Sequence, residues 1–112
     1  MVIFHNPRCK KSRDTLALIK EAGEEPEIVE YLKETPSKEQ LRTALHKLGM
    51  SAAEIVRKGE KEYKENFKGK ELSEEEWLEA FQQHPKLIER PIVIKGDKAV
   101  IGRPPENVQE LL

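Results

Sequence analysis

The sequence predicts an α/β fold in which a small mixed sheet carries helices and an all-helical insertion. Three observations lead to this prediction. The chain begins with a strand–helix–strand pattern, its middle shows only helical patterns, and its last part shows two strands and a helix. A length of 112 residues fits one domain, residues 1–112, with the helical insertion at about residues 35–85.

The amino-terminal pattern predicts a strand, a helix and a second strand. Residues 2–4 are wholly apolar, as in a strand buried on both faces. From about Lys10 the pattern is helical, and Gly23 ends it. A second strand is expected over residues 27–32. Short connections make this a βαβ unit with a parallel strand pair. The residues expected on the inner face of the helix are Thr15, Leu18, Ile19 and Ala22.

The middle of the chain predicts helices with recognisable starts and stops. Ser37, Ser51 and Ser73 are each followed three residues later by Gln or Glu, which is the pattern of a capping box. Gly49 ends the first of these helices, and Pro85 halts the last. Residues 58–72 are charged and nearly featureless, so we expect a mobile surface loop there.

The carboxyl-terminal part predicts a hairpin followed by a short helix. Residues 92–94 and 99–101 are apolar strands, and Gly96-Asp97 lies at the tip between them. Two prolines then open a helix, whose expected inner face is Val108, Leu111 and Leu112. The whole order, βαβ, helical insertion and ββα, is a thioredoxin-like layout.

Composition excludes several classes of function. The net charge of −1 gives no general reason to expect nucleic acid or an acidic membrane as partner. No apolar run is long enough to span a bilayer, and no signal peptide is visible, so we expect a cytoplasmic protein. His5, His46 and His84 are far apart in sequence, and we expect neither a metal site nor a bound cofactor.

The single cysteine, Cys9, is the strongest candidate for chemistry. It lies where a predicted strand is followed by a predicted helix, beside backbone N–H groups that favour negative charge. Its cationic neighbours favour the thiolate as well; they are Arg8, Lys10, Lys11 and Arg13. The alternative is an inert buried cysteine, which is common among free cysteines.

Ser12 limits the redox chemistry, because it stands where a dithiol oxidoreductase has its second cysteine. Any redox cycle must therefore use thiols from outside the chain. Ser12 is a possible hydrogen-bond donor to the Cys9 sulfur, and is also a normal residue for the first turn of a helix. For His5, four residues before Cys9, we favour a structural role in the loop over that of a base.

Three arginines are the second feature of the sequence that suggests a functional site. Arg57, Arg90 and Arg103 each lie where an element starts or stops. A guanidinium group is a planar fork that binds tetrahedral oxyanions through two hydrogen bonds. Arg90 also precedes Pro91, at a place where a cis peptide bond would bring a loop to a thiol site. The alternative for all three arginines is an ordinary solvated surface charge.

Four motifs together resemble the glutaredoxin-coupled arsenate reductases. They are HNPRCKKSR, SAAEIVRKGE, HPKLIERPIVI and IGRPPE, and they occur in order over essentially the whole chain. The resemblance implies a thioredoxin-like fold with a helical insertion. It also implies that Cys9 attacks arsenate, that glutathione displaces the product from sulfur, and that glutaredoxin reduces the resulting mixed disulfide.

The same resemblance implies roles for individual residues. The oxyanion would be bound by Arg57, Arg90 and Arg103, with Arg90 preceding a cis proline at Pro91. His5 and Arg13 match residues that surround the nucleophile and help to keep it ionised, and Asn6 and Ser12 belong to the same motif. Lys10 and Lys11 depart from the pattern, because these reductases carry small or neutral residues there.

Two other readings stay open at this point. The first is a glutathione-dependent protein-thiol reductase of the same fold, in which the arginines bind a carboxylate or a phosphate. The second is a non-enzymatic regulator resembling Spx, which binds RNA polymerase. The redox switch of that group usually needs a second thiol, and Ser12 occupies its position here.

Overall fold

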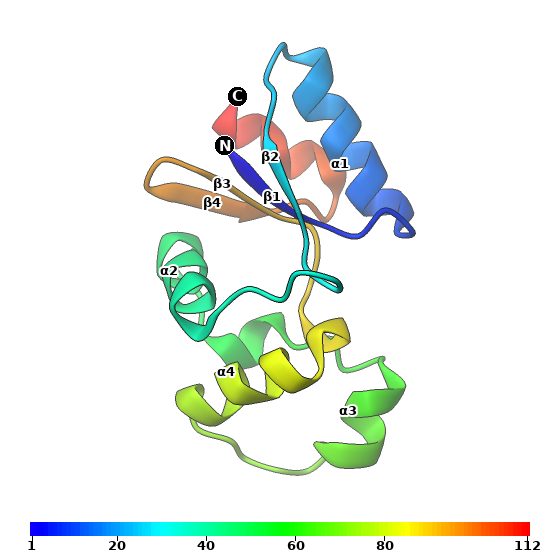
Figure 1. Ribbon diagram of the computed structural model, residues 1–112, viewed down its shortest axis with the longest axis vertical. Helices are drawn as coiled ribbons and strands as arrows, with labels where there is room; N and C mark the ends of the chain where they lie inside the picture. The colour runs from blue at the N-terminus through cyan, green and yellow to red at the C-terminus, as the bar shows by residue number, and fades with distance from the viewer. The chain divides into compact units, whose positions relative to one another are not determined.

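The computed structural model describes residues 1–112 and contains one four-stranded sheet in the order β2-β1-β3-β4 (Figure 1). The strands are β1 (Val2–His5), β2 (Glu27–Glu30), β3 (Ile92–Lys95) and β4 (Lys98–Ile101). β1 and β2 are parallel, whereas β1–β3 and β3–β4 are antiparallel. The small mixed sheet that the sequence predicts is therefore confirmed.

Strand directions bring four chain segments to one end of this sheet. β1 and β2 both end there, with Phe4 paired to Val29. β3 runs the other way and so begins there, with Ile92 paired to Phe4. β4 reverses once more and ends there, with Ile101 paired to Ile92. The loops after β1, β2 and β4 and the segment before β3 consequently share one end of the sheet, which we call the loop end.

Two helices cover one face of the sheet. Helix α1 (Lys10–Glu21) follows the loop after β1, and the 3-10 helix η3 (Pro105–Leu111) follows β4. They contact each other as well as the sheet, and in Figure 1 they lie side by side. Their shared core consists of Ile3, Ile19, Val93, Val108 and Leu111. The helical period of α1 and the alternation of the strands together create this core.

The chain divides into two compact units, one formed by residues 1–34 with 90–112 and the other by residues 35–89. The second unit is entirely helical. Its elements are α2 (Lys38–Leu48), η1 (Ala52–Ile55), α3 (Lys61–Asn66), α4 (Glu74–Gln83) and η2 (Pro85–Leu87). Helix α4 contacts α2, η1 and η2 and contributes buried Trp77, Leu78 and Phe81. No helix of the chain is both long and apolar enough to cross a membrane.

Local signals in the sequence set most helix boundaries. The capping boxes of Ser37 with Gln40 and of Ser73 with Glu76 are complete, and at η1 the Ser51 N–H donates to the Glu54 carboxylate at 2.8 Å. Each box satisfies backbone N–H groups that a helix start would leave unpaired. The hairpin is also confirmed, with Gly96 at φ 63° in its two-residue turn.

The prediction of a loop over residues 58–72 is wrong in part, because this segment contains α3. The aromatic residue after the helix explains the difference. Phe67 packs against Trp77 at a ring-centroid distance of 5.7 Å and against His84 at 5.5 Å. His84 also pairs with Glu62 of α3 at 3.0 Å. These contacts come from α4 and its end, so the local sequence pattern does not contain them.

Three smaller predictions also differ from the structure. The last helix is a 3-10 helix, and Leu112 is 44% exposed rather than part of its inner face. Ala22 caps α1 and is exposed. β2 stops at Glu30 instead of continuing to residue 32, because the N–H groups of Lys33 and Glu34 both donate to the Glu30 carbonyl and form a turn.

The core of the sheet unit can be tested with one matched pair of substitutions. Ile19 is fully buried, whereas Ile28 on edge strand β2 is 42% exposed. We expect Ile19→Ala to lower the free energy of unfolding by about 2–5 kcal/mol, and Ile28→Ala to lower it by less than about 1 kcal/mol. Urea denaturation followed by circular dichroism measures both. Equal losses would contradict this assignment of the core.

Candidate active site

The loop after β1 is held by its own backbone and side chains. The Oδ1 atom of Asn6 accepts a hydrogen bond from the Arg8 N–H at 3.0 Å, and its carbonyl accepts one from the Cys9 N–H at 3.0 Å. Arg13 reaches back from α1 and donates from Nη1 to the Pro7 carbonyl at 3.0 Å. An asparagine followed by proline is well suited to such a turn. The loop therefore delivers Cys9 to the start of α1 in a fixed conformation.

Cys9 is the N-cap residue of α1, with extended backbone angles of φ −94° and ψ 121°. Its thiol is free and the residue is only partly buried, so Cys9 is not the fully buried cysteine of the alternative interpretation. The first N–H groups of a helix lack acceptors within it, and they favour a negative charge beside them. Among the neighbouring cations, Lys10 pairs with Asp14 at 2.8 Å.

Ser12 bonds to the strand rather than to the cysteine. Its side chain is fully buried. Its Oγ accepts a hydrogen bond from the Asn6 N–H at 3.1 Å and lies 2.6 Å from the Nδ1 of His5. The possible hydrogen bond from Ser12 to the Cys9 sulfur is not formed. The serine instead ties the first turn of α1 to the end of β1.

His5 is buried beneath the same loop. Burial lowers the pKa of His5 below its ordinary value of 6.5; Glu30 opposes this shift, and Arg13 and Lys20 add to it. Burial acts in this direction because the charged ring loses its hydration. A neutral ring bonded to Ser12 fits the structural role that we favoured from the sequence.

One of the three arginines, Arg103, contacts Cys9 at the loop end of the sheet, and its guanidinium group also reaches the backbone of Arg90. The Nη1 of Arg103 lies 4.0 Å from the Cys9 sulfur and 3.5 Å from the Arg90 carbonyl. Arg90 and Arg103 are both partly buried. The peptide bond between Arg90 and Pro91 is cis, as the sequence predicts, and so is the one between Arg103 and Pro104. The segment after β4 thus approaches the thiol, and the segment before β3 contacts that segment through the Arg90 carbonyl.

Gly102 and Thr15 are site residues that our sequence reasoning missed. The Gly102 N–H donates to the Pro91 carbonyl at 2.9 Å. A Cβ atom on Gly102 would lie only 2.5 Å from the Thr15 Oγ1 and 2.8 Å from the Pro91 Cγ. The buried Thr15 hydroxyl donates to the Lys11 carbonyl at 2.8 Å. A glycine directly before Arg103 was the one available signal for this close approach.

Arg57 belongs to the helical unit, where it already has two acidic partners. Its guanidinium group pairs with Glu60, and its Nε lies 3.7 Å from a carboxylate oxygen of Glu89. Its backbone N–H donates to the Leu87 carbonyl at 2.8 Å. Arg57 is therefore an arginine whose guanidinium group is paired with carboxylates of its own unit, residues 35–89.

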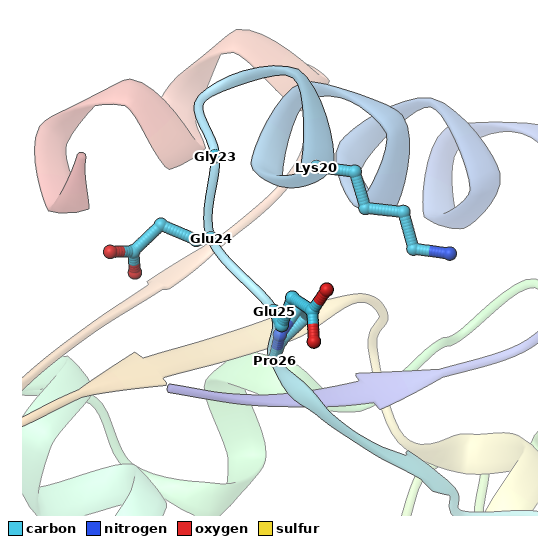
Figure 2. Close-up of a pocket in the computed structure, with 5 residues that line it drawn as sticks. All are labelled: Lys20, Gly23, Glu24, Glu25 and Pro26. Carbon is cyan, nitrogen blue, oxygen red and sulfur yellow. The ribbon is translucent and has the colours of Figure 1, made fainter.

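Two surface pockets lie at opposite ends of the sheet unit. One, of about 270 Å³, is lined by the loop after β1 and by the turn after β2. The other, of about 480 Å³, is lined by Lys20, Gly23, Glu24, Glu25 and Pro26 between α1 and β2. Figure 2 shows the Lys20 and Glu24 side chains pointing apart there. No cluster of three or more His, Cys, Asp or Glu residues could hold a metal ion.

The close approach at Gly102 gives a first prediction for the site. Gly102→Ala forces the new methyl group into Thr15 and Pro91, so we expect a loss of about 1–3 kcal/mol in the free energy of unfolding. Adding Thr15→Ala removes one side of this clash, and the double variant should lose less than the sum of the single losses. Gly59→Ala is the control, since nothing lies within 4 Å of a Cβ there. Additive losses in urea denaturation would contradict the close approach.

The pKa of His5 gives a second prediction. In the unfolded chain His5 takes up a proton near pH 6.5, whereas in the folded chain the pKa of His5 is lower. The neutral ring therefore contributes its full stability above about pH 6.5, and this contribution is lost as the pH falls below that value. We expect the stability advantage of the wild type over His5→Asn to shrink from about pH 7.5 to about pH 5. Denaturation curves at several pH values measure it; an advantage that grows toward acid would refute the assignment.

Comparison with known proteins places the chain in a family. The model of the ArsC family matches residues 4–111. A relative from Haemophilus influenzae named arsenate reductase is 46% identical, covering 100% of this chain and 98% of that protein. The uncharacterized protein YfgD of Escherichia coli is 53% identical, with 98% and 94% covered. A solved structure of an arsenate reductase from Vibrio cholerae superposes with a TM-score of 0.94 at 45% identity, with 99% and 96% covered. This neighbour confirms the thioredoxin-like fold, and the chain belongs to the ArsC family.

Proposed function

We propose that the chain reduces arsenate to arsenite, with Cys9 as the nucleophile and with glutathione and glutaredoxin as reductants. The observation that carries this proposal is the Arg103 guanidinium group 4.0 Å from the Cys9 sulfur, at the start of α1. A thiol between a cation and a helix N-terminus is suited to attack a tetrahedral oxyanion. Membership of the ArsC family and relatives named arsenate reductases support arsenate as that oxyanion.

In the first step the Cys9 thiolate attacks the arsenic atom. A sulfur–arsenic bond forms, an arsenic–oxygen bond breaks, and the oxygen leaves as water after taking up protons. The positive charges of Arg90 and Arg103 would stabilise the oxyanion as its charge redistributes. We propose Arg57 as a third arginine for the same ligand, because the resemblance to the family implies this role. His5, Asn6, Ser12, Arg13 and Pro91 would support this arrangement by fixing the backbone around the sulfur.

In the second step a glutathione thiolate attacks the Cys9 sulfur and forms a disulfide with it. The electron pair of the sulfur–arsenic bond stays with arsenic, which is reduced from As(V) to As(III) and leaves as arsenite. The two sulfur atoms are oxidised to the mixed disulfide. Glutaredoxin then removes the glutathionyl group by thiol–disulfide exchange. The single cysteine of this chain supports an external thiol, because no second cysteine is present to attack Cys9.

The proposal predicts arsenate-dependent oxidation of NADPH in a mixture of the protein, glutathione, glutaredoxin and glutathione reductase. Cys9→Ser should abolish it, because an alcohol is a much weaker nucleophile than a thiolate. No turnover by folded wild type, or equal turnover by Cys9→Ser, would overturn the proposal. Continued reduction of a model mixed disulfide without arsenate turnover would instead favour a glutathione-dependent protein-thiol reductase.

A second comparison tests which cations contact the oxyanion. Arg90→Ala should lower kcat/KM for arsenate by at least about 100-fold, as expected when a charged group that stabilises the reacting oxyanion is removed. Lys10 is exposed and already paired with Asp14. Lys10→Ala should therefore lower kcat/KM by less than about fivefold, since an exposed charge contributes about 1 kcal/mol or less. Equal losses in the two variants would argue against the arginine assignment.

A further inference from the structure

We propose that the pocket between the Cys9 loop and the turn after β2 binds the thiol donor, a small peptide-like thiol with carboxylate groups. This inference rests on the proposed function and adds the place from which the second reactant approaches. The pocket has a volume of about 270 Å³.

The two walls of the pocket are fixed parts of the sheet unit. One wall is the loop from His5 to Arg8, which directly precedes Cys9. The other contains Glu30, Leu32 and Lys33, where the N–H of Lys33 closes a turn on the Glu30 carbonyl at 2.9 Å. Because β1 and β2 are parallel, both walls lie at the loop end of the sheet. Ligands of open α/β sheets typically bind outside the carboxyl ends of the strands.

The strand order separates this pocket from the arginines. β1 lies between β2 and β3, so the turn after β2 and the segment before β3 flank the Cys9 loop on opposite sides. Arg90 precedes β3, and Arg103 follows β4 beyond it. An oxyanion next to Arg103 would thus occupy the β3 side of the sulfur. The pocket would stay open on the β2 side while the arsenic adduct is present.

The in-line geometry of the second step fits such an arrangement. A thiolate that displaces a group from sulfur approaches in line with the bond that breaks, opposite the leaving atom. With arsenic on the β3 side of Cys9, the incoming thiolate comes from the β2 side. The new sulfur–sulfur bond then forms there as the sulfur–arsenic bond breaks and its electron pair stays with arsenic. A donor bound in the pocket is on the side from which this attack proceeds.

The charges of the pocket match a thiol that carries carboxylates and an ammonium group. Arg8 is exposed and forms no ion pair; its backbone N–H bonds to Asn6, while its guanidinium group is available. Lys33 pairs with Glu30 at 3.6 Å, but the Lys33 side chain is 80% exposed, so this ion pair is weak. Two cations and one carboxylate fit glutathione, which has two carboxylates and one ammonium group.

Binding can be measured apart from catalysis with S-methylglutathione, which lacks a reactive thiol. We expect saturable amide NMR shifts at Asn6, Arg8 and Lys33 of the wild-type protein. Arg8→Ala should raise Kd by about tenfold, the loss of affinity expected when one hydrogen-bonded charge is removed. Arg8→Lys should recover part of that affinity. Lys10→Ala, which removes another exposed cation next to Cys9 in the sequence, should leave Kd within about twofold. Absent shifts, shifts centred elsewhere, or equal effects of Arg8→Ala and Lys10→Ala would overturn the inference.

Steady-state kinetics separate this inference from the proposed function. In the coupled assay, Arg8→Ala should raise KM for glutathione by about tenfold and leave KM for arsenate unchanged. A rise in KM for arsenate alone would place Arg8 at the oxyanion and overturn the pocket assignment. If the wild-type protein reduces no arsenate, the proposed function fails, and the S-methylglutathione titration still decides whether the pocket binds the donor.

Discussion

The position of β1 between a parallel and an antiparallel neighbour is the constraint on which the site depends. With β2 parallel to β1 and β3 antiparallel to it, the end of β1, the end of β2, the start of β3 and the end of β4 all lie at the loop end. Cys9 is therefore next to residues that are about ninety positions later in the sequence. A different strand order or register would leave Cys9 at the start of a helix without the arginine that follows β4.

Close packing around α1 then fixes the contact between Arg103 and the Cys9 sulfur that this topology makes possible. Ser12 and His5 join the first turn of α1 to the end of β1 through buried hydrogen bonds. On the other side, Thr15 of α1 approaches the backbone of Gly102 so closely that no side chain fits there. Because Arg103 directly follows Gly102, the helix and the hairpin cannot separate without moving the guanidinium group from the sulfur. Burial of polar groups that are fully paired makes such an arrangement specific as well as stable.

Features that depend on neighbouring residues could be predicted from the sequence, whereas features that depend on tertiary packing could not. Capping boxes, the glycine turn of the hairpin and the cis bond before Pro91 are short-range signals, and the structure has all of them. Helix α3 depends on Phe67 packing against α4, and the partner of the Ser12 hydroxyl depends on how α1 meets β1. The contact of Arg103 with Cys9 spans 94 residues. The sequence suggested the participants in the site, but the sheet topology determines which of them meet.

The proposed role of Cys9 is to carry the arsenic and then the glutathionyl group, with no second protein thiol. It is tested most directly by mass spectrometry of the protein incubated with arsenate and glutathione in the absence of glutaredoxin. We expect one glutathionyl group per chain, located on the peptide that contains Cys9 and formed only when arsenate is present. Glutathionylation that is independent of arsenate, or no modification while arsenite still accumulates, would contradict it.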